Sequence, residues 1–155
     1  MLKKLFGQIT RERKVSPTYQ IGLVHSKTYR IYKQITTTAL KKYNLSFVDW
    51  LLLGLLYDAG EMRYGVLAET LGVEASFVSV LVEQLRARGY IREKKSSTDK
   101  RVKQIILSKK GLSLIPDVEE HLKSKMSRAT EGVPLSEMQK YMETIQLLED
   151  SQAKS

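Results

Sequence analysis

Basic side chains crowd one short segment past the middle of the chain. Six lysines and arginines lie between positions 92 and 103, against two acids in the same stretch. The bases are Arg92, Lys94, Lys95, Lys100, Arg101 and Lys103, and the acids are Glu93 and Asp99. Cations at this density can bind the phosphates of a nucleic acid, although an ordinary solvated surface of a basic protein is the alternative.

The same segment has the pattern of a β-hairpin. Residues 90–94 and 101–107 are predicted to be two strands, and the second contains the β-branched Val102, Ile105 and Ile106. The polar stretch "SSTD" supplies a turn between them. The prediction is a basic hairpin whose tip carries Asp99, Lys100 and Arg101.

A helix-turn-helix pattern lies directly before this hairpin. Ala68, Gly72 and Val78 are spaced by four and six positions, as that motif requires. A small alanine lets the two helices approach, Gly72 can take the left-handed backbone of the turn, and Val78 fills the angle between the helices. The second helix is predicted from Glu74 to Arg88. A basic hairpin directly after a helix-turn-helix is a wing.

The outward face of the second helix is mostly uncharged. With Val73, Val78, Leu81 and Leu85 turned inward, seven positions remain outside: Glu74, Ala75, Ser76, Phe77, Ser79, Val80 and Glu83. None of them is basic. If this helix reads DNA, the serines would hydrogen-bond phosphates or bases, the apolar residues would contact thymine methyl groups, and the wing would supply the charge.

Long helices are predicted on both sides of this region. Ser16 and Pro17 form a helix start, and the following helix runs to about Asn44, roughly 40 Å at 1.5 Å per residue. Its apolar stripe consists of Ile21, Val24, Thr28, Ile31, Ile35, Ala39 and Tyr43. A small domain cannot cover a stripe of that length alone, so we expect the stripe to be buried in a dimer.

Two further sets of capping residues complete the predicted helices. Ser46 and Asp49 form a capping box that opens an apolar core helix ending at Gly60. After the wing, Ser108 caps a helix that Pro116 is expected to kink and Gly132 to end. Ser136 and Gln139 are then expected to form the capping box of a final helix. The fold class is therefore mostly α with a small β-hairpin wing.

Composition and charge limit the function classes. The 155 residues have a formal net charge of +9 and contain no cysteine, which excludes disulfides, thiolate metal sites and cysteine nucleophiles. Residues 1–42 carry ten bases against one acid, whereas residues 112–155 carry more acids than bases. No apolar run approaches the roughly 20 residues that a membrane span needs, and "MLKKLFGQITRERK" is not expected to be a signal peptide. The expected location is the cytoplasm, with no membrane partner.

From Leu45 to Gly111 the sequence resembles the MarR family of winged helix-turn-helix transcriptional regulators. The resemblance rests on "LAETLGV", on "LVEQLRARGYI" and, most specifically, on the wing pattern "STDKRVKQIILSKKG". It implies three regions: a basic arm at 1–14, a dimerisation region at 15–44 and 112–155, and a DNA-binding lobe at 45–111.

The resemblance also implies roles. The expected molecule is a homodimer on a pseudo-palindromic double-stranded DNA site, with the helix from Glu74 in the major groove and Arg101 reaching the minor groove. Asp99 would hold the wing or an arginine in place. Such proteins commonly repress genes and release DNA when a small, often phenolic, effector binds. The expected DNA contacts are Ala75, Ser76, Phe77, Ser79, Val80, Lys94, Lys95, Asp99, Lys100, Arg101 and Lys103.

The family usually has arginine where this chain has Ala75 and Val80. Two alternatives to specific DNA binding therefore stay open: a MarR-like dimer acting as a ligand-sensing or protein-interaction module, and a protein that coats nucleic acid non-specifically through the wing and the basic arm. A phenolic effector could lie against Tyr19, Tyr29, Tyr32 and Trp50, although aromatic residues at helical spacing are more often core. His25 and His121 fall short of a metal ligand set, no cofactor is indicated, and no catalytic constellation suggests an enzyme.

Overall fold

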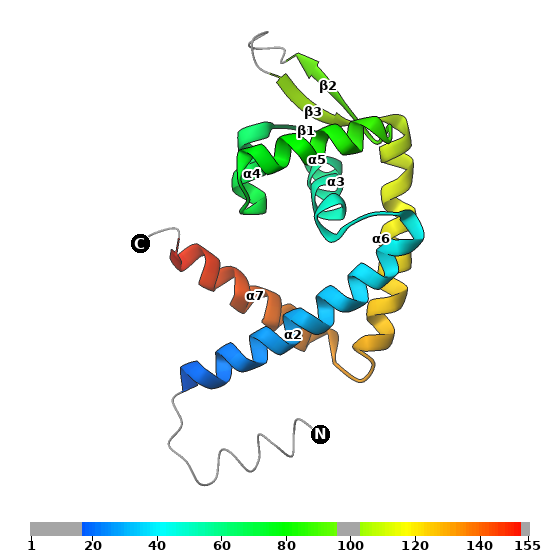
Figure 1. Cartoon of the computed structure of the whole chain (residues 1–155). Helices are drawn as coiled ribbons and strands as arrows, with labels where there is room; N and C mark the ends of the chain where they lie inside the picture. Colours follow the sequence, from blue (N-terminus) through cyan, green and yellow to red (C-terminus); the bar gives the residue numbers. More distant parts are fainter. Residues whose placement is uncertain (1–16, 96–102, 153–155) are drawn as a thin grey trace.

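The computed structural model describes residues 17–95 and 103–152. Figure 1 shows a lobe containing a small sheet, with long helices that extend away from it. The elements are α2 (Pro17–Leu40), the 3-10 helix η1 (Lys41–Tyr43), α3 (Phe47–Ala59), β1 (Glu61–Arg63), α4 (Tyr64–Leu71), α5 (Ala75–Ala87), β2 (Ile91–Lys95), β3 (Lys103–Leu107), α6 (Lys109–Ala129) and α7 (Leu135–Gln152). The predicted fold class, mostly α with a small hairpin wing, is confirmed.

The central helix α3 forms because both of its ends are satisfied. The Ser46 side chain accepts a hydrogen bond from the Asp49 backbone, and the Asp49 carboxylate accepts one from the Ser46 backbone, which is the predicted capping box. The helix ends at Gly60, whose φ of 76° suits glycine. Leu52 and Leu53 between these ends are completely buried. Helix α3 thus supplies the core on which the other elements pack.

The helix-turn-helix has the geometry that the spacing predicted. Helices α4 and α5 meet at 109° across a turn in which Gly72 has a left-handed φ of 64°. Val78 is fully buried and Ala68 nearly so, while the Val73 amide donates to the Ala68 carbonyl at 3.0 Å. The turn is therefore held by backbone hydrogen bonds and by the core at the same time.

The sheet has three strands rather than the two predicted. Strand β1 pairs antiparallel with β3, and β3 pairs with β2, so β3 lies in the middle. The three residues of β1 are too few to show the alternation of apolar and polar residues that marks a strand. Their conformation depends on pairing with a strand more than forty positions further along the chain.

The C-terminal helices differ from the prediction in their ends. Helix α6 begins after Ser108, whose side chain accepts from the Gly111 amide at 3.1 Å, as expected. It is one helix that contains Pro116, and it ends at Ala129, before the predicted stop at Gly132. Helix α7 begins one residue before Ser136, so the capping box expected there was wrong. The amides of Glu137 and Met138 donate to the carbonyl of Pro134 instead.

No single helix among the described residues is long and apolar enough to cross a membrane. Helices α4 and α5 reach the required apolar length only when they are joined across their 109° bend. Their buried residues, which include Leu67, Val78 and Leu85, face the core of the lobe.

Candidate nucleic-acid interface

Helix α5 presents one continuous outward surface, here called the reading face. It consists of Ala75, Ser76, Phe77, Ser79 and Val80, all of which are exposed. Phe77 and Val80 keep 45% and 54% of their surface open to solvent. About half of each side chain is therefore open to solvent and available to contact another molecule.

The polar groups of the reading face are few. The Ser79 hydroxyl donates to the Ala75 carbonyl at 3.1 Å, so its proton is engaged within the helix. Glu74 is the N-cap of α5, and its side chain makes no capping hydrogen bond. The first base on α5 is Arg86, in the last turn. The groups that this part of the helix offers to a phosphate are therefore the Ser76 hydroxyl and backbone amides.

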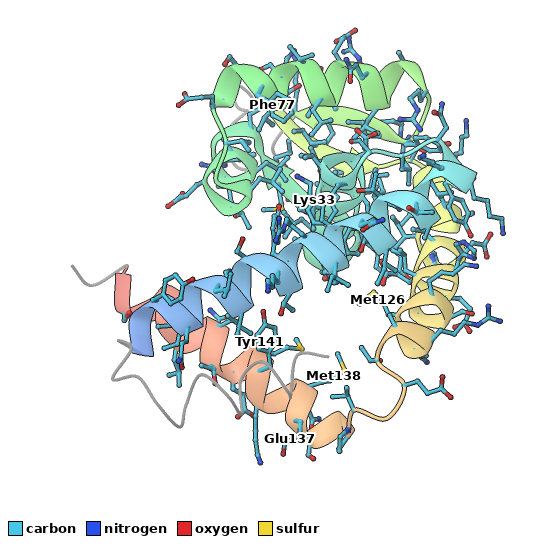
Figure 2. The ribbon with its side chains drawn as sticks, turned by 60° about the horizontal axis from the view of Figure 1, so that its bottom comes forward. Lys33, Phe77, Met126, Glu137, Met138 and Tyr141 are labelled. Atoms are coloured by element: carbon cyan, nitrogen blue, oxygen red, sulfur yellow. The ribbon has the colours of Figure 1, made fainter. Side chains whose placement is uncertain are left out.

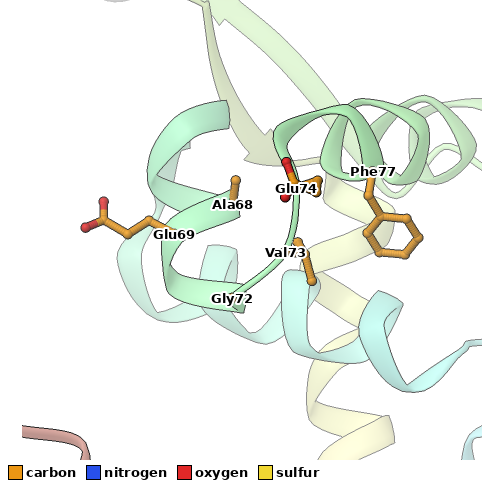
Figure 3. A pocket seen from close by; sticks show the side chains of 6 residues that line it. All are labelled: Ala68, Glu69, Gly72, Val73, Glu74 and Phe77. Atoms are coloured by element: carbon orange, nitrogen blue, oxygen red, sulfur yellow. The ribbon is translucent and has the colours of Figure 1, made fainter. Parts of the chain in front are cut away.

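A shallow depression lies at the start of α5 (Figure 3). It is lined by Ala68, Glu69, Gly72, Val73, Glu74 and Phe77. The Phe77 ring stands at one side of it, and the Glu69 carboxylate points away from that ring. The surface beside the reading face thus combines apolar side chains with acids.

The described part of the wing carries three exposed lysines. Lys94 forms an ion pair with Glu61, and Lys103 lies 3.3 Å from a carboxylate oxygen of Glu93. No such pair involves Lys95 among the described residues. Ion pairs at this exposure are weak, so Lys94 and Lys103 can exchange their carboxylates for phosphates. The expected contacts Asp99, Lys100 and Arg101 lie outside the described residues, as does the basic arm at 1–14.

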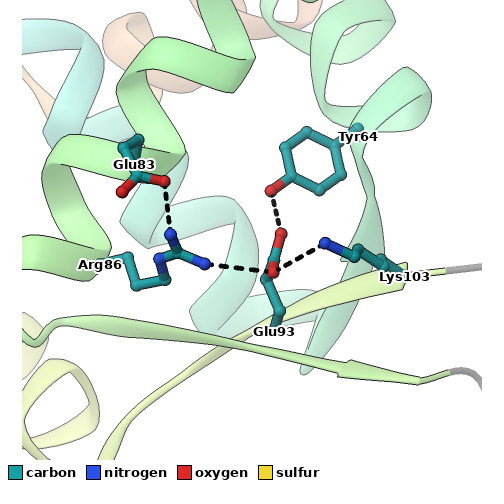
Figure 4. Close-up of polar contacts among 5 residues, drawn as sticks. All are labelled: Tyr64, Glu83, Arg86, Glu93 and Lys103. Atoms are coloured by element: carbon teal, nitrogen blue, oxygen red, sulfur yellow. Dashed lines mark hydrogen bonds and ion pairs between the residues drawn. The ribbon is translucent and has the colours of Figure 1, made fainter.

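A polar cluster between the wing and the helix-turn-helix was missed in the sequence (Figure 4). The Glu93 carboxylate accepts a hydrogen bond from the Tyr64 hydroxyl. Its other oxygen lies 3.3 Å from a guanidinium nitrogen of Arg86 and from the Lys103 ammonium. These contacts, with the Tyr64 hydroxyl as the main cause, hold the pKa of Glu93 below its ordinary value. Burial and the neighbouring carboxylate of Glu93 raise the pKa of Tyr64 to about 12. One signal was available, since strand alternation puts Glu93 on the same side as the apolar Ile91.

The same cluster includes Glu83, one of the outward positions predicted on the second helix. Its carboxylate is 2.6 Å from the Arg86 guanidinium. The negative charge of Glu83 is therefore offset locally, and Glu69 and Glu74 are the acids left beside the reading face.

The aromatic residues proposed for an effector separate into different places. Tyr32 and Trp50 line a small cavity of about 160 Å³, here called the aromatic cavity, together with Thr36, Glu119, Leu122, Lys123 and Met126. The indole of Trp50 donates to Glu119 at 2.6 Å, and burial raises the pKa of Tyr32. Tyr29 lines a neighbouring surface, which Tyr32 also lines, and Tyr19, which is 64% exposed, lines neither.

That other surface is an apolar groove between α2 and α7. It has a volume of about 520 Å³ and includes Met126, Met138 and Tyr141, which Figure 2 shows around the space below α2. The exposed apolar residues along it and its continuation are Ile21, Val24, Tyr29, Ile31, Tyr141 and Leu148. Within residues 17–95 and 103–152, no group of three or more potential metal ligands is found.

Residues 43–102 match the model of the MarR family. These residues hold α3, the helix-turn-helix and the first strand of the wing. This part of the chain is similar to the MarR family. Its resemblance to that family, predicted from the wing pattern and the turn, is confirmed.

Solved structures of MarR-type regulators share the fold over most of the chain. A MarR family transcriptional regulator from Rhodococcus sp. RHA1 is 22% identical with a TM-score of 0.77, covering 86% of this chain and 94% of that one. CouR from Rhodococcus jostii RHA1, bound to p-coumaroyl-CoA, is 24% identical with a TM-score of 0.76, covering 83% and 90%. A MarR variant from E. coli in complex with operator DNA is 12% identical with a TM-score of 0.75, covering 88% and 99%. At these identities the likeness extends to the fold alone.

Proposed function

We propose that this chain is a dimeric, sequence-specific DNA-binding transcriptional regulator of the MarR type, acting as a repressor. The observation that carries the proposal is the exposed reading face on α5, next to the lysine-bearing hairpin of β2 and β3 and held with it on one core. A helix exposed in this way fits the major groove, while a basic hairpin beside it reaches the flanking backbone. The similar fold of an E. coli MarR variant in complex with operator DNA supports the same placement.

Recognition on this proposal is largely apolar. Ala75, Phe77 and Val80 contact thymine methyl groups, the Ser76 hydroxyl hydrogen-bonds a phosphate or a base edge, and the Ser79 oxygen accepts a hydrogen bond from a base edge. The wing, with Lys94, Lys95, Lys103 and the expected Asp99, Lys100 and Arg101, supplies most of the charge. Specificity and electrostatic affinity thus come from different elements.

The partner that covers the apolar groove is a second copy of the chain. Helix α2 leaves Ile21 and Ile31 at 61% and 55% exposure, and α7 leaves Tyr141 and Leu148 at 45% and 55%. Two long helices that are both apolar and open can exchange these faces with an identical partner, which closes the assembly in a symmetric way. A dimer also places two reading faces on one duplex, as a pseudo-palindromic site requires.

A small aromatic effector is proposed for the aromatic cavity. The Thr36 side chain is 1% exposed, so its hydroxyl is a buried polar group beside the Tyr32 ring. It lies with Tyr32 and Trp50 at the junction of α2, α3 and α6. CouR, which has this fold, was solved with p-coumaroyl-CoA. Because Trp50 is the only tryptophan in the chain, its fluorescence can report binding of 4-hydroxybenzoate or p-coumarate directly.

The experiment that tests the proposal is a selection from random duplexes, followed by fluorescence-anisotropy titration at several salt concentrations. We expect one preferred half-site, with affinity that falls steeply as salt rises. Arg101→Ala is expected to weaken binding at least tenfold, as loss of a specific groove contact does. Equal binding of all sequences would show non-specific coating instead.

A second candidate function has a specific observation in its favour. The first three turns of α5 carry no base, and Glu69 and Glu74 remain beside the reading face. A dimer with such a surface could bind a protein or sense a ligand without choosing a DNA sequence. Failure of the selection to enrich any sequence, with the dimer intact, would favour this alternative.

A further inference from the structure

Glu93 occupies an unusual position for a carboxylate in a basic hairpin. It lies opposite Ile105 in the sheet, two residues after the buried Ile91, and therefore on the face that packs against the core. Its side chain is 19% exposed. An ionised carboxylate at such a position is unfavourable unless polar partners satisfy it.

The partners come from three other elements (Figure 4). Tyr64, the first residue of α4, donates its hydroxyl to one oxygen. Arg86 from the last turn of α5 and Lys103 from the start of β3 both lie 3.3 Å from the other oxygen. Arg86 is itself held at 2.6 Å by Glu83 on its own helix. One carboxylate thus connects both helices of the helix-turn-helix to both strands of the wing.

We infer that Glu93 is a positioning residue that fixes the wing relative to the reading face. The inference rests on the proposed function, in which both surfaces contact the same duplex. Fixing their relation before binding reduces the conformational entropy lost on the DNA, and it sets which base step the wing meets. Glu93 itself has its oxygens directed at protein donors rather than at a ligand.

The sheet offers a matched control in Glu61. It also forms an ion pair with a wing lysine, Lys94, and accepts a hydrogen bond from Gln104 at 2.8 Å. Glu61 lies opposite Ile106, on the other face of the sheet, so it contacts neither α4 nor α5 through these bonds. Glu93→Gln and Glu61→Gln therefore remove the same charge from the same small sheet, but only the first interrupts the link to the reading face.

The test compares two duplexes that share the selected core and differ only in the flank, A·T-rich or G·C-rich. Wild type and Glu61→Gln should prefer one flank, whereas Glu93→Gln should lose that preference while it still selects the core. The expected loss on the preferred flank is about fivefold or more. Tyr64→Phe, which keeps the ring and removes one donor, should show a smaller loss. The double variant should not add to Glu93→Gln, because both act through one cluster.

A second readout needs no DNA. The chain has no cysteine, so Lys95→Cys carries a single nitroxide on each protomer. Electron spin resonance should show a more mobile wing with Glu93→Gln and Tyr64→Phe, and an unchanged one with Glu61→Gln. For every variant, the melting temperature and the fraction of protein that binds DNA are measured as well.

The outcomes separate the two ideas. Unchanged flank preference and unchanged wing mobility in Glu93→Gln would overturn the inference. It would equally be overturned if Glu93→Gln lost the same affinity for both duplexes and contained a smaller fraction of protein able to bind DNA, since that result means a role in folding only. If wild type selects no sequence, the proposed function fails, and the nitroxide measurement still decides whether Glu93 holds the wing to the helices.

Discussion

At the scale of single residues, the reading face of α5 is uncharged, and the first base of the helix, Arg86, comes only in its last turn. Phe77 and Val80 are large, apolar and about half exposed, and the Ser79 proton is engaged by the helix backbone. Apart from the Ser76 hydroxyl, the chemistry left for discrimination is therefore the contact of apolar groups with apolar groups. On a duplex, the thymine methyl is the group in the major groove that offers such a contact.

This chemistry predicts a dependence on thymine methyl groups. Replacing the thymines of the selected half-site by deoxyuridine removes only the methyl and leaves every hydrogen bond. We expect each methyl contacted by Phe77 or Val80 to contribute about 0.8 kcal/mol, so its removal weakens binding roughly fourfold. Anisotropy titration measures this, with thymines outside the half-site replaced as the control. In Phe77→Ala the same replacement should have a smaller effect, and an undiminished effect would contradict apolar readout.

The Glu93 cluster predicts a pH dependence with a defined sign. Because its folded pKa is lowered, Glu93 contributes stability that is present above its ordinary pKa of about 4.3 and is lost as the pH falls through the folded value. Glu93→Gln should reduce the free energy of unfolding by about 1–2 kcal/mol at pH 7. Urea denaturation from pH 7 to pH 3 should show this difference shrinking below about pH 4.

Tyr64 contributes stability with the opposite pH dependence. Its raised pKa of about 12 adds stability that is present below its ordinary pKa of about 10 and lost as the pH rises toward 12. Tyr64→Phe should therefore lose stability less steeply than wild type in alkali. If the difference in free energy of unfolding between wild type and Glu93→Gln stayed constant down to pH 3, it would contradict the stabilising role of the ionised Glu93. Glu131→Gln, at an exposed site, is the control.

The sequence anticipated the reading face but not this cluster, for a physical reason. Exposure on α5 follows from helical periodicity, so Ala75 to Val80 could be sorted into inward and outward positions without a structure. The partners of Glu93 lie in three elements up to 29 positions away, and no local pattern relates them. Contacts of that kind are known only when the fold is known.

At the scale of elements, the local signals were reliable where a cap or a tight turn fixed the backbone. Ser46, Gly72 and Ser108 took the positions expected of them, whereas the three residues of β1 and the start of α7 were missed. Gly111, the last residue of the wing pattern, also has a local requirement, and the structure gives the reason for glycine there. A Cβ at this position would lie 2.2 Å from the carbonyl oxygen of Tyr90. Helix α6 can approach the end of the wing only without a side chain there.

Gly111→Ala is therefore expected to destabilise the fold by about 3 kcal/mol, since backbone must move to relieve the overlap. Gly54→Ala is the matched control, because Gly54 lies inside α3 with no atom near its added Cβ. That change should stabilise the helix by about 1 kcal/mol. Thermal denaturation at one protein concentration should give opposite shifts in melting temperature. A neutral Gly111→Ala would mean that the wing and α6 are less closely packed than the structure has them.

At the scale of the whole molecule, the described residues leave a long apolar surface on the helices outside the lobe. The residues of the helix-turn-helix bury their inward face within one chain, but α2 and α7 do not. The sequence predicted this surplus from the length of α2 alone. It could not predict the groove, because its two sides, with Ile31 on α2 and Tyr141 on α7, are about 110 positions apart.

A second copy on this groove predicts that charge there separates the protomers and abolishes DNA binding together. Ile31→Glu places a carboxylate among apolar side chains, and it should weaken dimerisation by about 3 kcal/mol or more, a hundredfold or more in Kd. Gln34→Glu, an exposed change of the same charge three residues along α2, should leave the dimer intact. Sedimentation equilibrium measures the dimer, and anisotropy measures binding to full and half sites. A dimeric Ile31→Glu that binds as wild type does would place the partner elsewhere. A monomeric variant that keeps its affinity for a half-site but not for the full site would establish that the apolar groove serves to couple two reading faces.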